Sequence, residues 1–410
     1  MDKSGDKSGD AAPQTPNQRD SGQADGGTDK GERQRRALGL TASLSSETPG
    51  TLLPDPYPES CLERRSETSD SLIELARHTF QKLSSDGDWR PTPIQLQSWP
   101  VLKTRSRKES SSKRDNLNLV AIATTGSGKT LSYSVPMVDS CALVKGKKSR
   151  RYVHGLVLVP TRELALQVSK TLKVVTKTAN RLSGKSDKIA AVAIYGGVNR
   201  DEQIDALGKN SQYIVAATPL RLIDLLGIGE KDGNGKKPVP NEAIQRLFES
   251  TRYLVIDEAD QMAVKSDMSE QVDRIVGFLR EKSSELHKEC LFSATLPRRA
   301  VAKCSEWIHG PRATVKVDTV TVGKDSNKDS GNHAPEETKG RAAECKGPLD
   351  LSTIPAHITQ TLHVCANHKK PKKLMTTINK VRKAEKESGN RRSRGLLIVF
   401  FGRIKTLQCE

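Results

Sequence analysis

The sequence predicts an α/β fold in which helices flank a mostly parallel β-sheet. Short apolar runs recur along the chain, and most do not alternate with polar residues, as is typical of strands buried on both faces of a parallel sheet. Helical patterns such as RELALQVSKTLKVV and LRLIDLLG lie between several of these runs. This repeated alternation indicates a doubly wound α/β domain. The runs expected to form strands are Leu117–Ala123, Gly155–Val159, Ile189–Tyr195, Tyr213–Ala217, Tyr253–Ile256 and Cys290–Phe292.

Changes in composition divide the chain into segments. Residues 1–69 are rich in Ser, Gly, Asp, Gln and Pro without periodic apolar residues, so we expect a disordered N-terminal tail. Residues 70–317 contain the alternating pattern and form the predicted α/β domain. Residues 318–353 have the polar, low-complexity composition of a linker. Residues 354–410 show a strand, helix and strand pattern, which we interpret as the start of a second, truncated α/β unit.

Net charge, cysteine spacing and the length of apolar runs indicate which partners the protein binds and in which cellular compartment it works. A formal charge of +18 favours polyanions, with nucleic acid ahead of anionic membranes, although solvated basic loops would give the same charge. The cysteines are dispersed and form no CxxC pair, which argues against zinc and indicates reduced thiols in an intracellular protein. Nucleus, nucleolus, cytoplasm and organelle all stay open. No apolar run approaches the roughly 20 residues that span a bilayer, so we expect no membrane partner.

The strongest motif is AIATTGSGKT, which follows the first apolar run of the predicted domain. Its glycines would let backbone N–H groups surround phosphate oxygens at the positive end of the next helix. Lys129 would reach the β- and γ-phosphates, and the Thr130 hydroxyl would hold Mg²⁺. The alternative is a glycine-rich turn that happens to contain lysine, but the flanking strand and helix patterns favour a P-loop. The expected nucleotide-binding residues are Ala123, Thr124, Thr125, Gly126, Ser127, Gly128, Lys129 and Thr130.

A second motif, YLVIDEADQM, supplies the acid that a P-loop enzyme needs. Its apolar run ends at Ile256, so Asp257 and Glu258 fall at the carboxyl end of a strand, where ligands of such sheets bind. Asp257 would bind Mg²⁺, and Glu258 would act as general base toward the attacking water. An acidic turn after a strand is common by itself, and the P-loop makes the pair specific.

The residues DEAD at Asp257–Asp260 resemble the name motif of the DEAD-box ATP-dependent RNA helicases of superfamily 2. PTPIQ, ending at Gln95, resembles the Q motif of that family, which implies that Gln95 reads the adenine edge. SAT, formed by Ser293, Ala294 and Thr295, resembles motif III, which in the family couples the ATP site to strand separation. The resemblance covers about Ser71 to Val317. It implies a RecA-like P-loop NTPase domain, with ATP and Mg²⁺ as cofactors and RNA as partner.

Three further motifs resemble those with which the family binds RNA: PTRELA, a Gly-Gly pair and TPLR. Each follows a predicted strand, so each lies at the same sheet edge as the P-loop. Phosphate contacts at such positions do not depend on base sequence, and 2′-hydroxyl contacts would be needed to prefer RNA. Taken alone, the arginines would be ordinary surface charges. The RNA-binding residues implied are Pro160, Thr161, Arg162, Gly196, Gly197, Thr218, Pro219 and Arg221.

The sequence departs from the family pattern in two places. The family tends to carry an aromatic residue shortly before PTPIQ, where this chain has Asp88–Trp89. An upstream aromatic usually packs on the adenine in the family, and Phe80 is the nearest candidate here. Ile398–Phe401 resembles motif IV of a second RecA-like domain, but no run matches motif V or the arginine-rich motif VI. Motif VI supplies arginine fingers in the family, and losing one costs about 10³–10⁵ in rate. We therefore expect this chain to hydrolyse ATP poorly.

Three functions follow as hypotheses. The first is an ATP-dependent RNA helicase of the DEAD-box type, an ATP hydrolase whose turnover separates short RNA duplexes locally. The second is a catalytically deficient ATP- and RNA-binding module without arginine fingers, with protein partners unknown. The third is a different P-loop ATPase that acts on DNA.

Overall fold

The computed structural model describes residues 26–45, 53–57, 70–83, 90–103, 117–143, 151–184, 188–229, 239–317, 364 and 366–387. The chain divides into two compact units, Met1–Ile354 and Pro355–Glu410. In the second unit, the described residues form a short 3₁₀ helix, Asn367–Lys369, and the helix α12, Lys370–Glu387. All described strands belong to the first unit.

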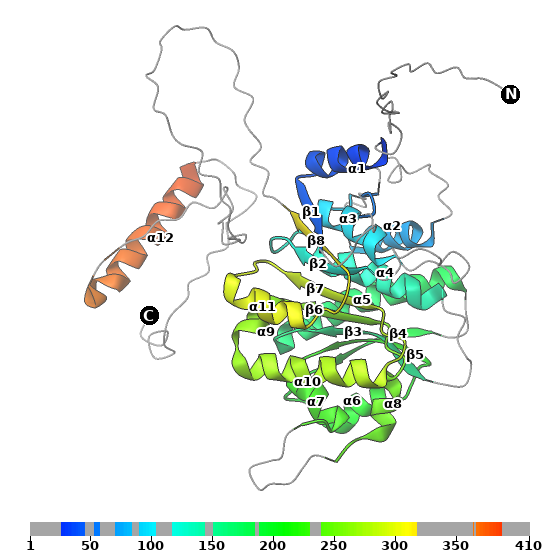
Figure 1. Cartoon of the computed structure of the whole chain (residues 1–410). Coiled ribbons are helices and arrows are strands. Elements are labelled where there is room, and N and C mark those ends of the chain that lie inside the picture. Colours follow the sequence, from blue (N-terminus) through cyan, green and yellow to red (C-terminus); the bar gives the residue numbers. More distant parts are fainter. Residues whose placement is uncertain are drawn as a thin grey trace, which may run out of the picture. The chain divides into compact units, whose positions relative to one another are not determined.

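The first unit contains an eight-stranded sheet in the order β1-β8-β2-β7-β6-β3-β5-β4 (Figure 1). Every neighbouring pair from β8 to β4 is parallel, and only β1 runs antiparallel, along β8. The sequence prediction of a mostly parallel, helix-flanked sheet is therefore confirmed. The strands are β1 (Leu40–Leu44), β2 (Asn118–Ile122), β3 (Tyr152–Leu158), β4 (Ile189–Ile194), β5 (Gln212–Ala217), β6 (Tyr253–Asp257), β7 (Lys288–Ser293) and β8 (Arg312–Val317).

Helices cover both faces of the sheet and bury a separate apolar core on each. Successive strand residues alternate between the cores: Leu119 and Ala121 belong to one, and Val120 and Ile122 to the other. Because both faces are covered, the central strands are apolar throughout. The first face carries α2 (Ser71–Leu83), α3 (Pro93–Leu102), α4 (Lys129–Leu143) and α5 (Arg162–Ser183). The second carries α6 (Arg200–Ala206), α7 (Pro219–Leu226), α8 (Glu242–Phe248), α9 (Ala259–Val264), α10 (Ser266–Lys282) and α11 (Arg298–Glu306).

The prediction of a disordered tail over residues 1–69 is wrong for the part that the structure describes. Residues 26–45 form α1 (Gly26–Ala37) and β1, and β1 pairs with β8 in a register that sets Leu40 opposite Val317. The reason is tertiary: β1 gains backbone hydrogen bonds along β8, and Leu40, Ala42 and Leu44 pack against the first apolar core. The run LTASL alternates apolar and polar residues, as a half-buried strand does, but it is only five residues long and lies in a polar stretch.

The six strands expected within residues 70–317 all form, and helices follow where the patterns placed them, at α2, α5 and α7. The sequence missed β8, whose apolar side chains alternate with polar ones. In α12, Leu374 and Ile378 are half-buried while Val381 is 46% exposed. The linker at 318–353 and the strands expected on either side of α12 lie outside the described residues.

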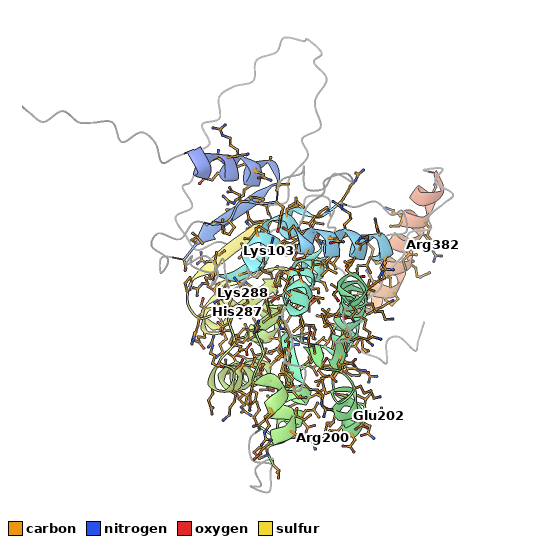
Figure 2. The ribbon with its side chains drawn as sticks, turned by 90° about the vertical axis from the view of Figure 1, so that its right-hand side faces the viewer. Lys103, Arg200, Glu202, His287, Lys288 and Arg382 are labelled. Carbon is orange, nitrogen blue, oxygen red and sulfur yellow. The ribbon has the colours of Figure 1, made fainter. Side chains whose placement is uncertain are left out.

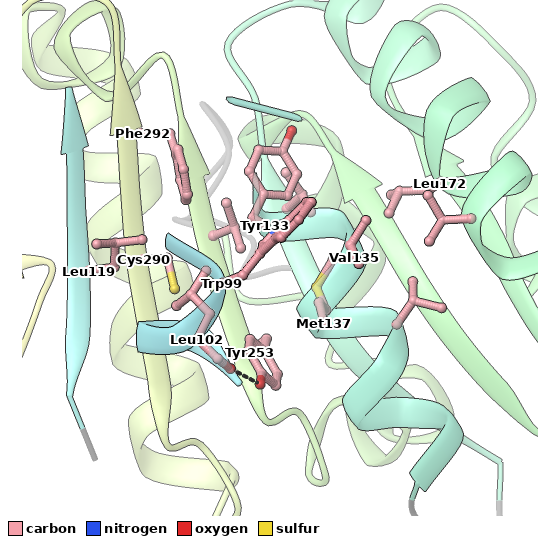
Figure 3. Close-up of a cluster of buried hydrophobic side chains, with 14 of the residues drawn as sticks. Trp99, Leu102, Leu119, Tyr133, Val135, Met137, Leu172, Tyr253, Cys290 and Phe292 are labelled. Carbon is pink, nitrogen blue, oxygen red and sulfur yellow. Dashed lines mark hydrogen bonds between the residues drawn. The ribbon is translucent and has the colours of Figure 1, made fainter. Parts of the chain in front are cut away.

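Polar side chains fasten α3 to the amino end of the sheet. Lys288 of β7 is 1% exposed and donates to the carbonyl oxygens of Val101 (3.1 Å) and Leu117 (2.9 Å); Figure 2 labels it with Lys103. The Tyr253 hydroxyl donates to the Leu102 carbonyl at 2.8 Å (Figure 3). These bonds satisfy carbonyls at the end of α3, where no further turn can accept them. They fix the helix that carries Gln95.

A buried carboxyl lies between α4 and the start of α2. Asp139 is 4% exposed and hydrogen-bonds the Ser71 side chain. Burial raises its pKa to about 6; the Ser71 bond lowers the pKa, nearby Asp70 raises it, and Lys103 lowers it. The folded protein therefore holds the Asp139 proton to a higher pH than the unfolded chain, whose aspartate ionises near pH 3.8.

We predict that Asp139→Asn stabilises the protein at neutral pH. The stability contributed by protonated Asp139 is complete below about pH 4 and is lost as the pH rises through about 6, while a carboxamide stays neutral. Urea unfolding should show the variant more stable than wild type by roughly 1–3 kcal/mol at pH 7.5, with little difference at pH 4. The exposed Asp205→Asn serves as control. Equal stability of wild type and Asp139→Asn at pH 7.5 would contradict the assignment.

Candidate active site

The loop between β2 and α4 has the form of a P-loop. Thr124, Thr125 and Gly126 are exposed, and the φ angles of Gly126 (+83°) and Gly128 (+91°) lie in the left-handed region that favours glycine. The Lys129 ammonium folds back onto the loop and donates to the carbonyl oxygens of Ala123 (2.6 Å) and Thr124 (3.0 Å). Phosphate oxygens placed in this loop would compete with those carbonyls for the same donors.

The acidic turn lies beside the P-loop because β6 and β2 both neighbour β7. Asp257, the last residue of β6, is 4% exposed, and burial raises its pKa. One carboxylate oxygen accepts from the Tyr133 hydroxyl at 2.8 Å, and the other accepts from the Glu258 backbone N–H at 3.0 Å. Both bonds lower the Asp257 pKa and so favour the ionised form that binds a cation.

Tyr133 also joins the two residues predicted to hold Mg²⁺. Its fully buried hydroxyl is hydrogen-bonded to the Thr130 side chain as well as to Asp257, and its ring packs edge-on against Phe292, with centroids 5.0 Å apart. Across the described part of the chain, no group of three or more His, Cys, Asp or Glu side chains is arranged to hold a metal ion by itself. Mg²⁺ usually takes one or two protein ligands besides phosphate and water, so a hydroxyl and a carboxylate fit.

Glu258 is the one non-glycine residue with positive φ (+52°) in the described part of the chain. This left-handed conformation turns the chain between β6 and α9. A glutamate adopts it at a cost, so the turn is held by its surroundings. The carboxylate of half-buried Glu258 accepts from Gln261 Nε2 at 2.6 Å. Burial raises the Glu258 pKa, and so do the neighbouring charges of Asp257 and Asp260, which moves the group toward the range useful to a general base.

The SAT residues contact both motifs. The Thr295 hydroxyl donates to Asp260 Oδ2 at 2.6 Å, and the Ser293 hydroxyl donates to the Thr295 carbonyl at 2.5 Å. Ala123 N–H, at the start of the P-loop, donates to the Ser293 carbonyl at 3.1 Å. A shift of this segment would therefore also displace the acidic turn and the start of the P-loop.

Gln95 lies in the first turn of α3 and is 1% exposed. Its Nε2 donates to the Gly128 carbonyl at 3.0 Å, while its Oε1 accepts from Thr92 N–H at 2.9 Å. A Cβ atom on Gly128 would collide with the Gln95 amide, so this contact requires glycine. Since the protein uses both ends of the amide, Gln95 bridges α3 and the P-loop, and its contact with adenine stays a prediction. Phe80 packs half-buried against the first core.

The predicted RNA motifs follow the neighbouring strands β3, β5 and β4. Val159 N–H donates to the Ala217 carbonyl and Thr218 N–H donates to the Ile194 carbonyl, both at 2.9 Å. Pro160 and Gly196 follow directly on from these strand ends. The carboxyl ends of the three strands are thus locked side by side.

Two arginines belong to the motifs that follow β3, β5 and β4. The Arg162 guanidinium lies 5.1 Å from the centroid of the Tyr195 ring, beside Gly197, whose φ is +83°. Arg221 donates to the Val198 carbonyl at 3.0 Å and pairs with Asp224 at 3.7 Å. Thr161 and Thr218 are the N-cap residues of α5 and α7, and Pro219 is the first residue of α7. Both helix starts direct backbone N–H groups toward this edge, where they favour anions.

The sheet order separates the two groups of motifs along one edge. The P-loop, SAT and acidic turn follow β2, β7 and β6, and the basic motifs follow β3, β5 and β4. A sequence model described as DEAD/DEAH box helicase matches residues 92–304, which contain all these motifs. The chain belongs to the DEAD/DEAH box helicase family.

Curated relatives place the chain among named helicases. It is 32% identical over 250 residues to the ATP-dependent RNA helicase DBP3 of Lodderomyces elongisporus, covering 61% of this chain and 38% of that protein. It is 28% identical over 366 residues to the probable ATP-dependent RNA helicase ddx5 of Dictyostelium discoideum, covering 86% and 41%. The chain thus spans about two fifths of the length of these relatives.

The crystal structure of the yeast DEAD-box splicing factor Prp28 has a similar fold, with a TM-score of 0.51 and 21% identity over 72% of this chain and 57% of that one. In the described part of this helicase-family chain, no helix has the length and apolar character to cross a membrane.

Sequence reasoning missed three side chains that organise this helicase-family site: Tyr133, Tyr195 and Asp224. Tyr133 carries a weak signal, since it stands four residues after Lys129 and so lies on the same face of α4. Neither Tyr195 nor Asp224 belongs to a motif considered above. Their roles depend on which loops the strand order brings together.

We predict that Tyr133→Phe weakens Mg²⁺-dependent nucleotide binding, most of all at low pH. The change removes the hydroxyl that lowers the Asp257 pKa but keeps the ring against Phe292, so Asp257 becomes harder to ionise. Titration of a fluorescent ADP analogue with Mg²⁺ should show about tenfold weaker binding at pH 6 and a smaller loss at pH 8.

Tyr213→Phe provides the matched control, because Tyr213 is a buried tyrosine of β5 whose hydroxyl accepts from Asn210 N–H. Identical Mg²⁺ dependence of wild type and Tyr133→Phe at both pH values would refute the role given to Tyr133.

Proposed function

We propose that the first unit is the nucleotide- and RNA-binding domain of an ATP-dependent RNA helicase. The observation that carries this proposal is the division of one sheet edge into two adjoining groups of motifs. One group offers a glycine-rich loop, a lysine and buried acids, and the other offers arginines and helix N-termini. The names of DBP3 and ddx5, which call both ATP-dependent RNA helicases, support it. Unwinding is proposed as an activity of the whole protein, since this chain spans about two fifths of the length of these relatives.

On the nucleotide side, the loop from Ala123 to Gly128 would surround the phosphates with backbone N–H groups. Lys129 would exchange its two loop carbonyls for β- and γ-phosphate oxygens. Thr130 and Asp257 would hold Mg²⁺, which neutralises charge on the phosphates. Glu258, whose raised pKa suits a base, would take the proton of the attacking water.

On the RNA side, the N-termini of α5 and α7 with Arg162 and Arg221 would bind successive backbone phosphates. Such contacts are insensitive to base sequence, as a helicase that acts on many duplexes requires. Thr295 is hydrogen-bonded to Asp260, and Ala123 N–H is hydrogen-bonded to the Ser293 carbonyl. A movement of the SAT segment would therefore displace residues of the proposed nucleotide site.

We predict that Lys129→Ala and Glu258→Gln separate binding from hydrolysis. Lys129→Ala should bind a fluorescent ATP analogue at least tenfold more weakly, because it removes the cation facing the phosphates. Glu258→Gln should bind like wild type but hydrolyse ATP about 10²-fold more slowly in the presence of RNA. Nucleotide binding is measured by fluorescence and hydrolysis by single-turnover phosphate release.

The wild-type chain also decides between the two main hypotheses. Nucleotide binding without measurable hydrolysis would favour the ATP- and RNA-binding module without turnover. If the wild type hydrolyses ATP, an unchanged rate in Glu258→Gln would contradict the assignment of Glu258 as general base.

We predict that Arg162→Ala and Arg221→Ala each weaken binding of single-stranded RNA to a similar extent for unrelated sequences. Each change should also reduce the slope of log affinity against log salt by about 1. Fluorescence anisotropy with two labelled RNAs and with DNA of matching sequence measures both effects. The control is Arg246→Ala, an exposed arginine of α8 that pairs with Glu242. If DNA of matching sequence bound as tightly as RNA, the result would support the hypothesis of a P-loop ATPase that acts on DNA.

A further inference from the structure

We call residues 26–45 and 53–57 the N-terminal clamp; α1 lies near α3, the helix that carries Gln95 (Figure 1). The clamp contacts α3 through Arg35 of α1 and through the segment 53–57, while β1 pairs with β8. Arg35 of α1 is 8% exposed and donates through Nε to Gln97 Oε1 at 2.8 Å. Its Nη2 donates to the carbonyl of Pro54 at 3.0 Å and of Leu53 at 3.4 Å, and it lies 3.5 Å from Asp55. One guanidinium therefore joins α1, the segment 53–57 and α3.

The segment 53–57 makes its own bonds to α3. Gln97, which is fully buried, donates through Nε2 to the Pro54 carbonyl at 2.9 Å. Tyr57 N–H donates to the Leu96 carbonyl at 3.1 Å, and the Tyr57 ring meets the Trp99 ring edge-on, with centroids 6.5 Å apart. The clamp thus contacts the middle of α3 through backbone and side chains.

The other side of α3 faces the nucleotide loop. Gln95 donates to the Gly128 carbonyl, and Trp99 Nε1 donates to the Leu131 carbonyl at 3.4 Å. Figure 3 shows Trp99 beside Tyr133, the residue that holds Asp257. Because Gln95 and Gln97 are two residues apart on a helix, they point in nearly opposite directions. α3 therefore lies between the clamp and the P-loop.

Burying the charged Arg35 side chain costs solvation free energy. This cost argues that Arg35 has a role beyond packing against the surface of the domain. Burial lowers its pKa, and the nearby charges of Asp55 and Glu32 offset that effect only in part. A buried guanidinium is tolerated where its donors find acceptors in a fixed arrangement. Here two of those acceptors, Leu53 and Pro54, belong to the clamp itself, and the third, Gln97, belongs to α3.

We propose that Arg35 is a positioning residue for nucleotide binding: through Gln97 it fixes α3, and α3 in turn holds the P-loop through the Gln95–Gly128 contact. This inference rests on the proposed function, since it takes the P-loop as the nucleotide site. It assigns to the N-terminal clamp a control over nucleotide affinity, and anything that displaces the clamp weakens nucleotide binding. By linkage, bound nucleotide strengthens the seating of the clamp.

Affinity for a fluorescent Mg²⁺·ADP analogue tests this on the 410-residue chain. Arg35→Ala should bind about fivefold more weakly or worse. Arg36→Ala removes the same charge from the next, exposed position and should bind like wild type. Arg35→Lys keeps the charge with fewer donors and should lie between the two. All affinities are measured at a temperature where urea titration shows each variant fully folded.

A double-mutant cycle tests the route. If Arg35 acts through Gln97, then Arg35→Ala combined with Gln97→Leu should bind within about twofold of the weaker single variant. Hydrogen exchange adds a second measurement, which would not depend on nucleotide if Arg35 only stabilised the fold. The Tyr57 amide, which bonds to Leu96, should exchange more slowly when nucleotide is bound, and this effect should vanish in Arg35→Ala.

A failure of the nucleotide site and a failure of the Arg35 role give different results in these experiments. If wild type binds no better than Lys129→Ala, the proposed nucleotide site fails, and the inference fails with it. If wild type binds well but Arg35→Ala matches Arg36→Ala, the inference alone is overturned, even where Arg35→Ala is less stable. Fully additive losses in the cycle would likewise overturn the route through Gln97.

Discussion

The parallel alignment of the strands from β8 to β4 is the constraint on which the rest of this structure depends. It brings the carboxyl ends of the strands to one edge, so that loops far apart in the chain meet there. The register sets Ile122 opposite Ser293 and Asp257 opposite Phe292, which aligns the P-loop, the SAT segment and the acidic turn. A slip of one residue would move each side chain into the opposite core, where its size and shape do not match its neighbours, so close packing on both faces holds the register.

The acidic turn shows how the fold accepts a local cost to place buried and half-buried carboxyl groups beside the P-loop. Asp257 is buried at the end of a central strand, and its pKa is raised by that burial. Tyr133 and the Glu258 N–H oppose the rise with hydrogen bonds, while Glu258 itself sits in a left-handed conformation. The apolar packing around Tyr133 and Phe292 compensates for these costs and keeps the geometry fixed.

Helix α3 is shared by parts of the molecule that the chain separates widely. Lys288 and Tyr253 fasten its end to the sheet, the N-terminal clamp holds its middle, and Gln95 reaches the P-loop from its first turn. A rigid helix with contacts on several sides can transmit a displacement from one of them to another. The clamp is thus placed to influence the P-loop through α3.

The sequence by itself determined the class of fold, the central strands, the P-loop and the acidic turn. These features depend on local rules: apolar runs for buried strands, glycines for positive φ at Gly126 and Gly128, and motif residues at strand ends. Only the tertiary structure decided that β1 closes the sheet edge at β8, that Tyr133 holds Asp257, and that Arg162 covers Tyr195. Tyr133 and Asp257 are 124 residues apart, and whether they meet depends on strand order and helix placement. That arrangement minimises the free energy of the whole domain, and no short stretch of sequence specifies it.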